Sequence, residues 1–469
     1  MPYGRHREDM VTGPYDLKLL RELSEFKKRW PSSQPTSSYQ NFFPALRWLQ
    51  LPSARHVILA RPLFFNDQLA YLSLPWANTP EPTFLLRDIL TLLPNLETLD
   101  LGAGQGSPFQ ECPELSESIY RLKSLRKLAT GSRMLDSDSI FQLASLPYLQ
   151  ALQFPNTSND VLHSLSALSS HPFVGLQCLE MNTTTLKPWP AFLGRLNPLQ
   201  LRTIKLNCSN VPSTGDIHEF FLALSDSPSQ PYMCSIHLIP SVNSVSFLAP
   251  KITTDVVVDF WILAPLLVFD NLTKLDFTLL CSFSFDDQDL ATMAASWPKL
   301  QHLQLGSALG WGQQSGITLR GVLALVKACP ELEHLGLTLD ASYLPSRTSS
   351  ELELDTEPLN AKICARVSSV NTKITYLQVG DSNIEDARAV ADFLYPIFPN
   401  VRGIGGVWLY RRAGSFTHQE REWHSIWQDV VSFMREARNC ARLMIAPSSL
   451  PRYPCNTAAS NNKYRLQCI

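Results

Sequence analysis

The chain has 469 residues, of which 45% are hydrophobic and 17% charged, so it holds enough apolar material for a large folded core. Forty basic and forty-two acidic residues give a formal net charge of -2, which excludes an overall field that would attract nucleic acid or anionic lipid. No apolar stretch approaches the length of about eighteen residues that a membrane span needs, and no apolar leader segment opens the chain. The ten cysteines lack zinc-type spacing, and we expect reduced thiols in an intracellular protein of the cytoplasm or nucleus.

Residues 1–40 precede any regular pattern. Residues 16–30 are an amphipathic stretch there, and they predict at most a single helix. From residue 41 onward the sequence repeats a phrase in which an apolar residue, often followed by proline, precedes Leu-x-x-Leu-x-Leu. The clearest copies are 43–51, 93–101, 146–154, 297–305 and 329–337.

The intervals between copies of the phrase identify its architecture. Its first leucine-like position falls at Leu46, Leu69, Leu96, Leu125, Leu149, Leu176, Leu201, Leu272, Leu300, Leu332, Ile374 and Val401. The first seven markers lie 23 to 29 residues apart, which is the period of leucine-rich repeats. The next gap, of 71 residues, is too long for one unit, and we expect a degenerate repeat at 234–238 to divide it.

Each repeat predicts one strand and one helix. In x-Leu-x-Leu the alternate side chains point to opposite faces, so the leucines enter the core and the x residues face outward. Helical spacing of apolar residues, often after an N-capping Ser, Asp or Thr, occurs at 137–146, 159–169, 216–224, 286–296, 318–329 and 385–397. The predicted fold class is therefore α/β, a leucine-rich-repeat solenoid. We expect a curved horseshoe with parallel strands on the concave face and helices on the convex face.

The repeats are expected to fill residues 41–407, with two interruptions. One insertion lies near 240–267 and is apolar but irregular. The other lies near 341–359 and is polar and rich in Ser, Glu and Pro, which predicts a projecting loop.

Residues 408–446 are expected to cap the last repeat, and the tail 447–469 is expected to be disordered. The capping region contains a predicted helix over 420–441. The apolar side of that helix carries Trp423, Trp427, Val430, Phe433 and Met434.

The strongest small-molecule motif is the run Leu-Asp-Leu-Gly-Ala-Gly-Gln-Gly at 99–106, which resembles the cofactor loop of class I S-adenosylmethionine-dependent methyltransferases. In that family an acidic residue and glycines follow a strand and let the backbone approach the cofactor. Here the strand is one copy of the repeat phrase, and Pro108 and Pro113 interrupt the position of the next helix. We therefore assign no cofactor and no cofactor-binding residue, and we keep a methyltransferase using Gly102–Gly106 as the alternative function.

Other enzyme motifs are missing from the sequence, including G-x-S-x-G, H-E-x-x-H and the phosphate-binding G-x-x-x-x-G-K-[ST]. His302 and His334 occupy equivalent repeat positions, but no Cys or Asp accompanies them in the pattern. No catalytic or metal-binding residue is therefore assigned. The basic clusters at 121–127 and 435–442 are interpreted as solvated faces, and nucleic acid is not an expected partner.

The outward x positions form a candidate recognition surface if the strands line the concave side. This surface has mixed charge and carries aromatic residues toward both ends, which is typical of protein binding. The predicted protein-binding residues are Trp48, Gln50, Tyr71, Asp100, Lys127, Gln153, Glu180, Lys205, Lys274, Asp276, His302, Gln304, His334, Tyr376 and Gln378. A partner seated on a rim or a loop instead is the alternative that the sequence leaves open.

The run ITLRGVLALVKACPELEHL at 317–335 resembles the repeats of F-box/leucine-rich-repeat proteins, particularly the large fungal group. Residues 386–401, with the Trp-containing helix after them, resemble the end of the same group. The resemblance covers about residues 40–440. It implies repeats that select a protein for ubiquitination, with an N-terminal F-box that docks the Skp adaptor of a cullin-RING ligase. An F-box is not evident in residues 1–40.

The sequence thus predicts a non-enzymatic protein–protein interaction scaffold. The resemblance implies a substrate-recognition subunit of a Skp–cullin–F-box ubiquitin ligase, or a relative that lacks the F-box. The expected partner is an unknown protein ligand on the repeat surface. The Skp adaptor and a cullin join it only if the full gene carries an F-box, and no membrane partner is expected.

Overall fold

The structure is a computed structural model. It describes residues 9–11, 45–51, 64–74, 84–102, 110–111, 115, 118–119, 121–131, 133–154, 162, 172–196, 200–241, 256–342, 370–409 and 417–445. Several predicted features lie outside the described residues: the helix at 16–30, all but Leu162 of the helix at 159–169, most of the insertion at 341–359, and the tail 447–469.

The chain forms two compact units, of which unit 1 comprises 1–249 and 254–282, and unit 2 comprises 250–253 and 283–469. The elements of unit 1 are β1 (Asp9–Val11), β2 (Trp48–Gln50), β3 (Tyr71–Ser73), α3 (Phe84–Thr91), β4 (Thr98–Asp100), β5 (Gln110–Glu111), β6 (Lys127–Ala129), β7 (Arg133–Met134), α5 (Ser137–Ala144), β8 (Ala151–Phe154), β9 (Cys178–Thr183), α7 (Trp189–Arg195), β10 (Thr203–Cys208), α8 (Thr214–Ser225), η1 (Gln230–Tyr232), β11 (Ser235–Pro240), β12 (Val257–Asp259), α9 (Phe260–Leu263), η2 (Ala264–Val268) and β13 (Lys274–Phe277).

Strand β14 (Ser282–Ser284) begins at the last residue of unit 1. The elements of unit 2 that follow it are α10 (Asp287–Ser296), β15 (His302–Leu305), α11 (Leu319–Ala328), β16 (His334–Leu337), β17 (Asp340–Ala341), β18 (Tyr376–Gln378), β19 (Asn383–Ile384), α13 (Ala387–Ile397), β20 (Gly403–Gly405), η4 (Val407–Leu409) and α14 (His418–Ile445).

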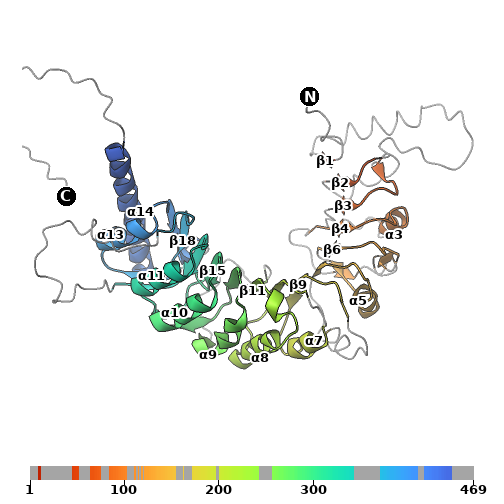
Figure 1. Ribbon diagram of the computed structural model, residues 1–469, viewed down its shortest axis with the longest axis horizontal. Helices are drawn as coiled ribbons and strands as arrows, with labels where there is room; N and C mark the ends of the chain where they lie inside the picture. The colour runs from red at the N-terminus through yellow and green to blue at the C-terminus, as the bar shows by residue number, and fades with distance from the viewer. Residues whose placement is uncertain are drawn as a thin grey trace, which may run out of the picture. The chain divides into compact units, whose positions relative to one another are not determined.

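Unit 1 is built on a parallel sheet in the strand order β1-β2-β3-β4-β6-β8-β9-β10-β11-β13. The register aligns equivalent leucines, so that Leu49, Leu72 and Leu99 lie side by side on three successive strands. Parallel neighbours require a crossover connection, and helices supply it between many of the strands. The helices α3, α5, α7 and α8 lie on one side of the strands (Figure 1), and we call the opposite side the open face.

The core lies between the sheet and the helices, and the repeat phrase explains why. All twelve marker positions of the phrase are buried, with exposed fractions between 0 and 3%. The second leucine of each copy is buried as well, as at Leu99 and Leu303. Burying these side chains stabilises each repeat by about 1.5 to 3 kcal/mol per leucine, which makes the period of the sequence the period of the fold.

The predicted N-caps are confirmed at α10 and α11, which begin after Asp286 and Thr318. At α5 and α8 the cap lies before the predicted Ser137 and Asp216: Asp136 accepts a hydrogen bond from the backbone N–H of Ser139, and Ser213 accepts one from that of Asp216. In α10 a full capping box forms, because Asp286 and Asp289 each accept from the other's backbone N–H. Each cap satisfies a donor that the first helical turn would otherwise leave without a partner.

Helices α3, α7 and α9 of unit 1 were not predicted. Helices α3 and α7 have eight and seven residues, so each offers only two turns of apolar periodicity. The insertion near 240–267 also contains regular structure in its described part, because β12, α9 and η2 follow one another there. The apolar character of that segment is explained by Val258, Leu263 and Leu266, which are fully buried.

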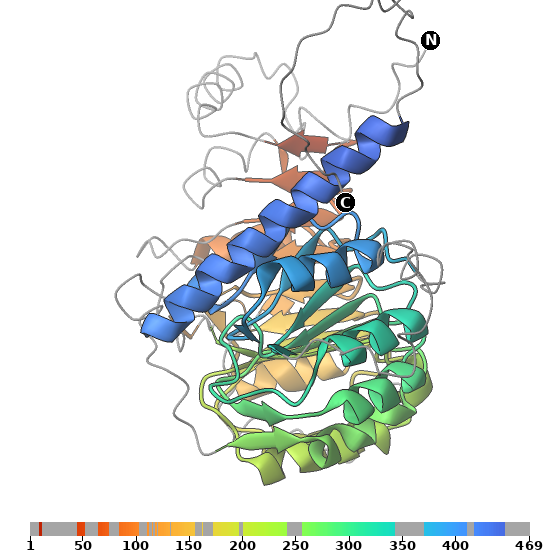
Figure 2. The same cartoon turned by 90° about the vertical axis from the view of Figure 1, so that its left-hand side faces the viewer.

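In unit 2 the strands β15, β16, β18 and β20 pair in parallel in that order, α11 connects β15 to β16, and α13 lies between β18 and β20 in the chain. The long helix α14 packs against α13 and contacts β19 and β20 (Figure 2). After β15 the chain turns sharply at Gly306 and Gly310, whose φ angles of 61° and 82° favour glycine. The turn buries Trp311 completely, and its indole Nε1 donates to the carbonyl of Leu305 at 2.7 Å.

The chain is an α/β leucine-rich-repeat solenoid. Strands and helices alternate along both units, the strands pair in parallel, and the repeating leucines form the core. In the part of the chain that the structure describes, no helix is long and apolar enough to cross a bilayer.

Candidate functional site

The open face of unit 1 presents two rows of outward side chains, because every parallel pair keeps the same register. From β2 to β13, the first row consists of Trp48, Tyr71, Thr98, Lys127, Ala151, Cys178, Thr203, Ser235 and Lys274. Over the same strands, the second row consists of Gln50, Ser73, Asp100, Ala129, Gln153, Glu180, Lys205, His237 and Asp276. All ten sequence-predicted residues of this unit fall in these rows, although their role in binding stays a prediction.

The first row carries an aromatic pair on β2 and β3. The rings of Trp48 and Tyr71 stack with centroids 4.8 Å apart and an interplanar angle of 17°. Both side chains are half-buried, so each keeps part of its surface in contact with solvent. Each ring holds the other in place, so little conformational entropy is lost when a partner binds. Rings ordered in this way often anchor protein partners.

A hollow of about 210 Å³ follows next to the aromatic pair. Its lining includes Ala129 and Ala151, which have short side chains between longer neighbours in the two rows. Its lining also includes Tyr71, Thr98, Asp100, Lys127, Gln153, Cys178 and Glu180. The lining of the hollow thus combines apolar side chains with charged groups of both signs.

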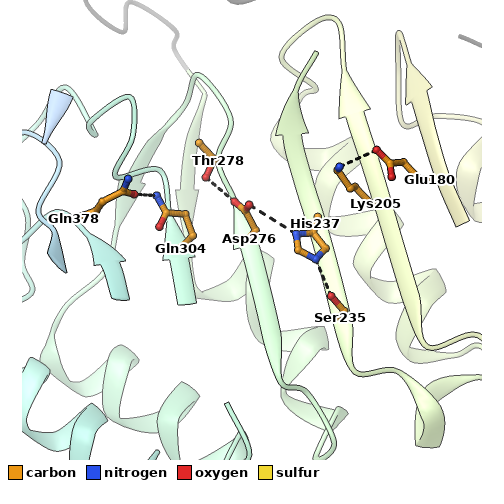
Figure 3. Close-up of polar contacts among 8 residues, drawn as sticks. All are labelled: Glu180, Lys205, Ser235, His237, Asp276, Thr278, Gln304 and Gln378. Atoms are coloured by element: carbon orange, nitrogen blue, oxygen red, sulfur yellow. Dashed lines mark hydrogen bonds and ion pairs between the residues drawn. The ribbon is translucent and has the colours of Figure 1, made fainter. Parts of the chain in front are cut away.

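Polar contacts connect the next strands (Figure 3). Glu180 and Lys205 form an ion pair of 2.7 Å between β9 and β10. On the next two strands of the sheet, β11 and β13, His237 Nδ1 lies 3.7 Å from Asp276 Oδ2. Thr278 Oγ1 donates to Asp276 Oδ1 at 2.7 Å. A half-exposed pair such as Glu180–Lys205 adds only about 0 to 1 kcal/mol to stability, so its charges remain available to a partner.

Ser235, His237 and Asp276 are the residue types of a hydrolytic triad. The Oγ atom of Ser235 lies 2.7 Å from Nε2 of His237, as such a triad requires. The distance of 3.7 Å between His237 and Asp276 exceeds that of a hydrogen bond, however. The backbone N–H of Ser235 also donates to the carbonyl of Arg202, so it cannot stabilise an oxyanion. The cluster is therefore a polar patch of the open face. Sequence analysis expected a repeat at 234–238 but did not include its outward positions, Ser235 and His237, among the predicted surface residues.

The open face of unit 2 has its own outward row. His302 and His334 are adjacent in the register, with ring centroids 5.1 Å apart. Among the residues described in the structure, no three His, Cys, Asp or Glu side chains converge as metal ligands would. Tyr376, the third predicted residue of this row, is exposed and lies against Gly403 of the neighbouring strand.

The predicted residues Gln304 and Gln378 contact each other although a whole strand separates them. Gly336 occupies the aligned position on β16, between Gln304 on β15 and Gln378 on β18. The amide Nε2 of Gln304 donates to Gln378 Oε1 and to Ser307 Oγ. The missing side chain at Gly336 is what makes this bridge possible, because a Cβ there would overlap Gln304.

Gly336→Ala should therefore destabilise unit 2 by about 1 to 3 kcal/mol, since the bridging amide must give way. The matched control is Gly194→Ala in α7, where a Cβ would meet nothing within 4 Å. That substitution should stabilise unit 1 by about 0.5 to 1 kcal/mol through the higher helix propensity of alanine. Urea denaturation of the two variants checks the pair, and equal shifts in the same direction would contradict the bridge.

Comparison with known proteins supplies no family. No family model and no curated protein matches the chain. Among solved structures, the chain is similar to one in the crystal structure of the yeast Rad7 and Elc1 complex, with a TM-score of 0.38 and 13% identity over 87% of each chain. It is also similar to the leucine-rich repeat-containing protein LegL7 from Legionella pneumophila, with a TM-score of 0.30 and 14% identity over 76% of this chain and 96% of that one.

The predicted alternative site at Gly102–Gly106 lies outside the described residues except for Gly102. Gly102 has a φ of 61°, and its N–H donates to Asp100 Oδ1 at 2.8 Å. The other carboxylate oxygen of Asp100 accepts a hydrogen bond of 3.4 Å from Ser73 Oγ. The acidic residue of the motif therefore stabilises the turn after β4 and joins it to β3.

A larger cavity, of about 650 Å³, lies in unit 2 between the loops that follow the strands and the first turns of α14. Asp381 lines it and accepts hydrogen bonds from the N–H groups of Trp311 and Gly312 at 2.7 Å each. It also accepts a bond of 3.0 Å from Thr338 Oγ1. This carboxylate is saturated by the loops that it holds together, so we do not select the cavity as the candidate site.

Proposed function

We propose that the chain is a non-enzymatic protein-interaction scaffold whose open face in unit 1 binds a protein partner. The single observation that carries the proposal is the two-row surface, in which an aromatic pair, a hollow and an ion pair follow one another along adjacent strands. A solenoid offers a continuous surface of this kind because each repeat adds one strand to it.

The charge of this surface favours a protein over a nucleic acid. On strands β2 to β13 its lysines are Lys127, Lys205 and Lys274, and its carboxylates are Asp100, Glu180 and Asp276. Three positive and three negative groups cancel, whereas a surface that follows a phosphate backbone needs a clear excess of positive charge. Aromatic anchors surrounded by mixed charges are common at the centre of protein interfaces.

The finer proposal is that the partner is a protein selected for ubiquitination. It rests on the resemblance of residues 317–335 and 386–401 to F-box/leucine-rich-repeat proteins. In that role the chain serves as a substrate-recognition subunit of a Skp–cullin–F-box ligase, or acts as a relative that binds the same class of partner without the F-box. The alternative, a methyltransferase, has less support because Asp100 is occupied within the fold.

Cys178 provides a direct test, because its thiol lines the hollow. Burial raises the pKa of Cys178, and the negative charge of Glu180 raises it further, so alkylation should be slow but measurable at pH 8.5. The tagged full-length chain is purified from cells with its bound proteins, and iodoacetamide labelling is read by mass spectrometry. We expect at least tenfold slower labelling of Cys178 in the recovered complexes than in the free chain.

Cys440 on α14 is the internal control, since it is exposed and lies in unit 2. Its labelling rate should not change. Equal labelling of Cys178 in bound and free chains would contradict the proposed binding face. The same purification tests the ligase proposal, because recovery of neither a Skp adaptor nor a cullin would rule out membership in that complex.

A further inference from the structure

A second surface of unit 1 exposes apolar side chains on its helix-covered side, where the open-face proposal has no role for them. Trp261 on α9 is 68% exposed, and Val268 on η2 is 46% exposed. Leu222 on α8 and Val257 on β12 are 41% and 39% exposed. Because α8 packs against both α9 and η2, these side chains belong to one neighbourhood, which we call the Trp261 patch. Single exposed apolar residues are ordinary, but a group around an exposed tryptophan indicates an interaction site.

The Trp261 ring is held in place by α8. It stacks on the His218 ring with centroids 4.7 Å apart and an interplanar angle of 27°. His218 and Leu222 are four residues apart, so both lie on the same face of the helix. The Nδ1 atom of His218 is buried and has no hydrogen-bond partner in the part of the chain that the structure describes. Trp261 thus stays 68% exposed while its ring rests on that of His218.

The chain segments that carry the Trp261 patch have charges of one sign in their described residues. The acidic residues of the surrounding elements are Asp216, Glu219, Asp226, Asp259 and Asp270. Within the described residues 206–241 and 256–273 there is no lysine or arginine. Glu219 and Asp226 lie three residues before and four residues after Leu222, which places both beside it on α8. Asp259 is fixed as the N-cap of α9, where its carboxylate accepts from Ile262 N–H at 3.2 Å.

We propose that the Trp261 patch docks a basic, amphipathic protein segment. Its apolar side chains would cover Trp261 and Leu222, and its lysines or arginines would meet the surrounding carboxylates. A cation over the exposed indole face adds a further attraction. A second copy of this chain is disfavoured because it would bring five carboxylates against five more, and anionic lipid or nucleic acid would be repelled. This site is independent of the open face, so either surface can be disproved without the other.

Fluorescence anisotropy with the full-length chain tests this proposal. The probes are labelled 20-residue peptides with leucine on one helical face and arginine or lysine on the other, in several registers. The matched probes keep the leucines and carry glutamate instead of the basic residues. We expect micromolar binding of the basic peptides, weakened tenfold or more by Trp261→Ala and by Glu219→Lys combined with Asp226→Lys. Higher salt should also weaken binding, because the charges are exposed.

Tyr148→Ala is the control, because Tyr148 is 57% exposed elsewhere in unit 1 and should not affect peptide binding. Circular dichroism melting curves verify that each variant folds; Trp261 is mostly exposed, so its loss should leave the fold intact. The proposal is overturned if no basic peptide binds, if the glutamate peptides bind equally well, or if Trp261→Ala binds as the parent does. If the parent chain self-associates and Trp261→Ala abolishes this, the patch instead binds a second copy of the chain.

Discussion

Trp427→Ala should lower the free energy of unfolding of unit 2 by about 3 to 5 kcal/mol. Trp427 is fully buried on the inner side of α14, and its indole Nε1 donates to the carbonyl of Ser382 at 3.1 Å. Ser382 in turn accepts the N–H of Leu339 at 2.7 Å, so the indole covers a hydrogen bond between neighbouring repeats. Alanine would leave a cavity and an unpaired buried carbonyl, which together account for the size of the loss.

Trp423→Ala is the matched control, because Trp423 lies one turn earlier on the same helix and is only half-buried. Its loss should cost about 1 kcal/mol or less. Urea denaturation measures both changes, and hydrogen-exchange mass spectrometry locates them. In the Trp427 variant, faster exchange should be concentrated in α14 and in the loops that it covers. A small effect of Trp427→Ala, equal to that of Trp423→Ala, would show that α14 does not cap unit 2.

The architecture was predictable because the core imposes a strict pattern on the sequence. A marker position such as Leu149 or Leu300 must be apolar in every repeat, since it points between the sheet and the helices. The parallel register then follows from the repeat, because equivalent leucines have to align. Within each strand, successive side chains point to opposite faces of the sheet. This alternation alone was enough to predict outward residues such as Gln50 and Gln378.

The particular contacts on the open face were not predictable in the same way. Outward positions have no common residue type, so nothing in the sequence marked the space above Ala129 and Ala151 as a hollow. The bridge across Gly336 depends on which residues three different repeats place at one register position. Trp261 lies in an irregular segment between repeats. The repeat pattern is missing there, so the sequence did not indicate which of its side chains would be exposed.

The largest expected effect on function comes from exchanging the charges of Glu180 and Lys205. The double variant Glu180→Lys, Lys205→Glu can keep the ion pair between β9 and β10, so the free energy of unfolding should change by less than about 1 kcal/mol. A partner that has complementary charges, however, would meet each charge reversed. Like charges facing each other across an interface cost several kcal/mol, so we expect partner binding to fall tenfold or more.

Tyr71→Ala is a second variant, and it tests the same surface without changing any charge. Tyr71 lines the hollow and stacks on Trp48, so its removal takes away one proposed anchor without changing the charge. Anchor residues of this kind contribute about 2 kcal/mol or more when a partner covers them. If both variants lose the partner, a change in electrostatic attraction alone cannot explain the loss, because Tyr71→Ala changes no charge. The common cause would then be damage to the binding face.

Quantitative affinity purification is the most direct test of the open face as the binding site. The tagged parent chain, the double charge exchange, Tyr71→Ala and the Trp261→Ala variant are purified from the same cells, and bound proteins are compared by mass spectrometry. Our account predicts a shared set of proteins that the parent and Trp261→Ala recover equally and both open-face variants lose by tenfold or more. Recovery of every bound protein at parent levels by the folded open-face variants would contradict it.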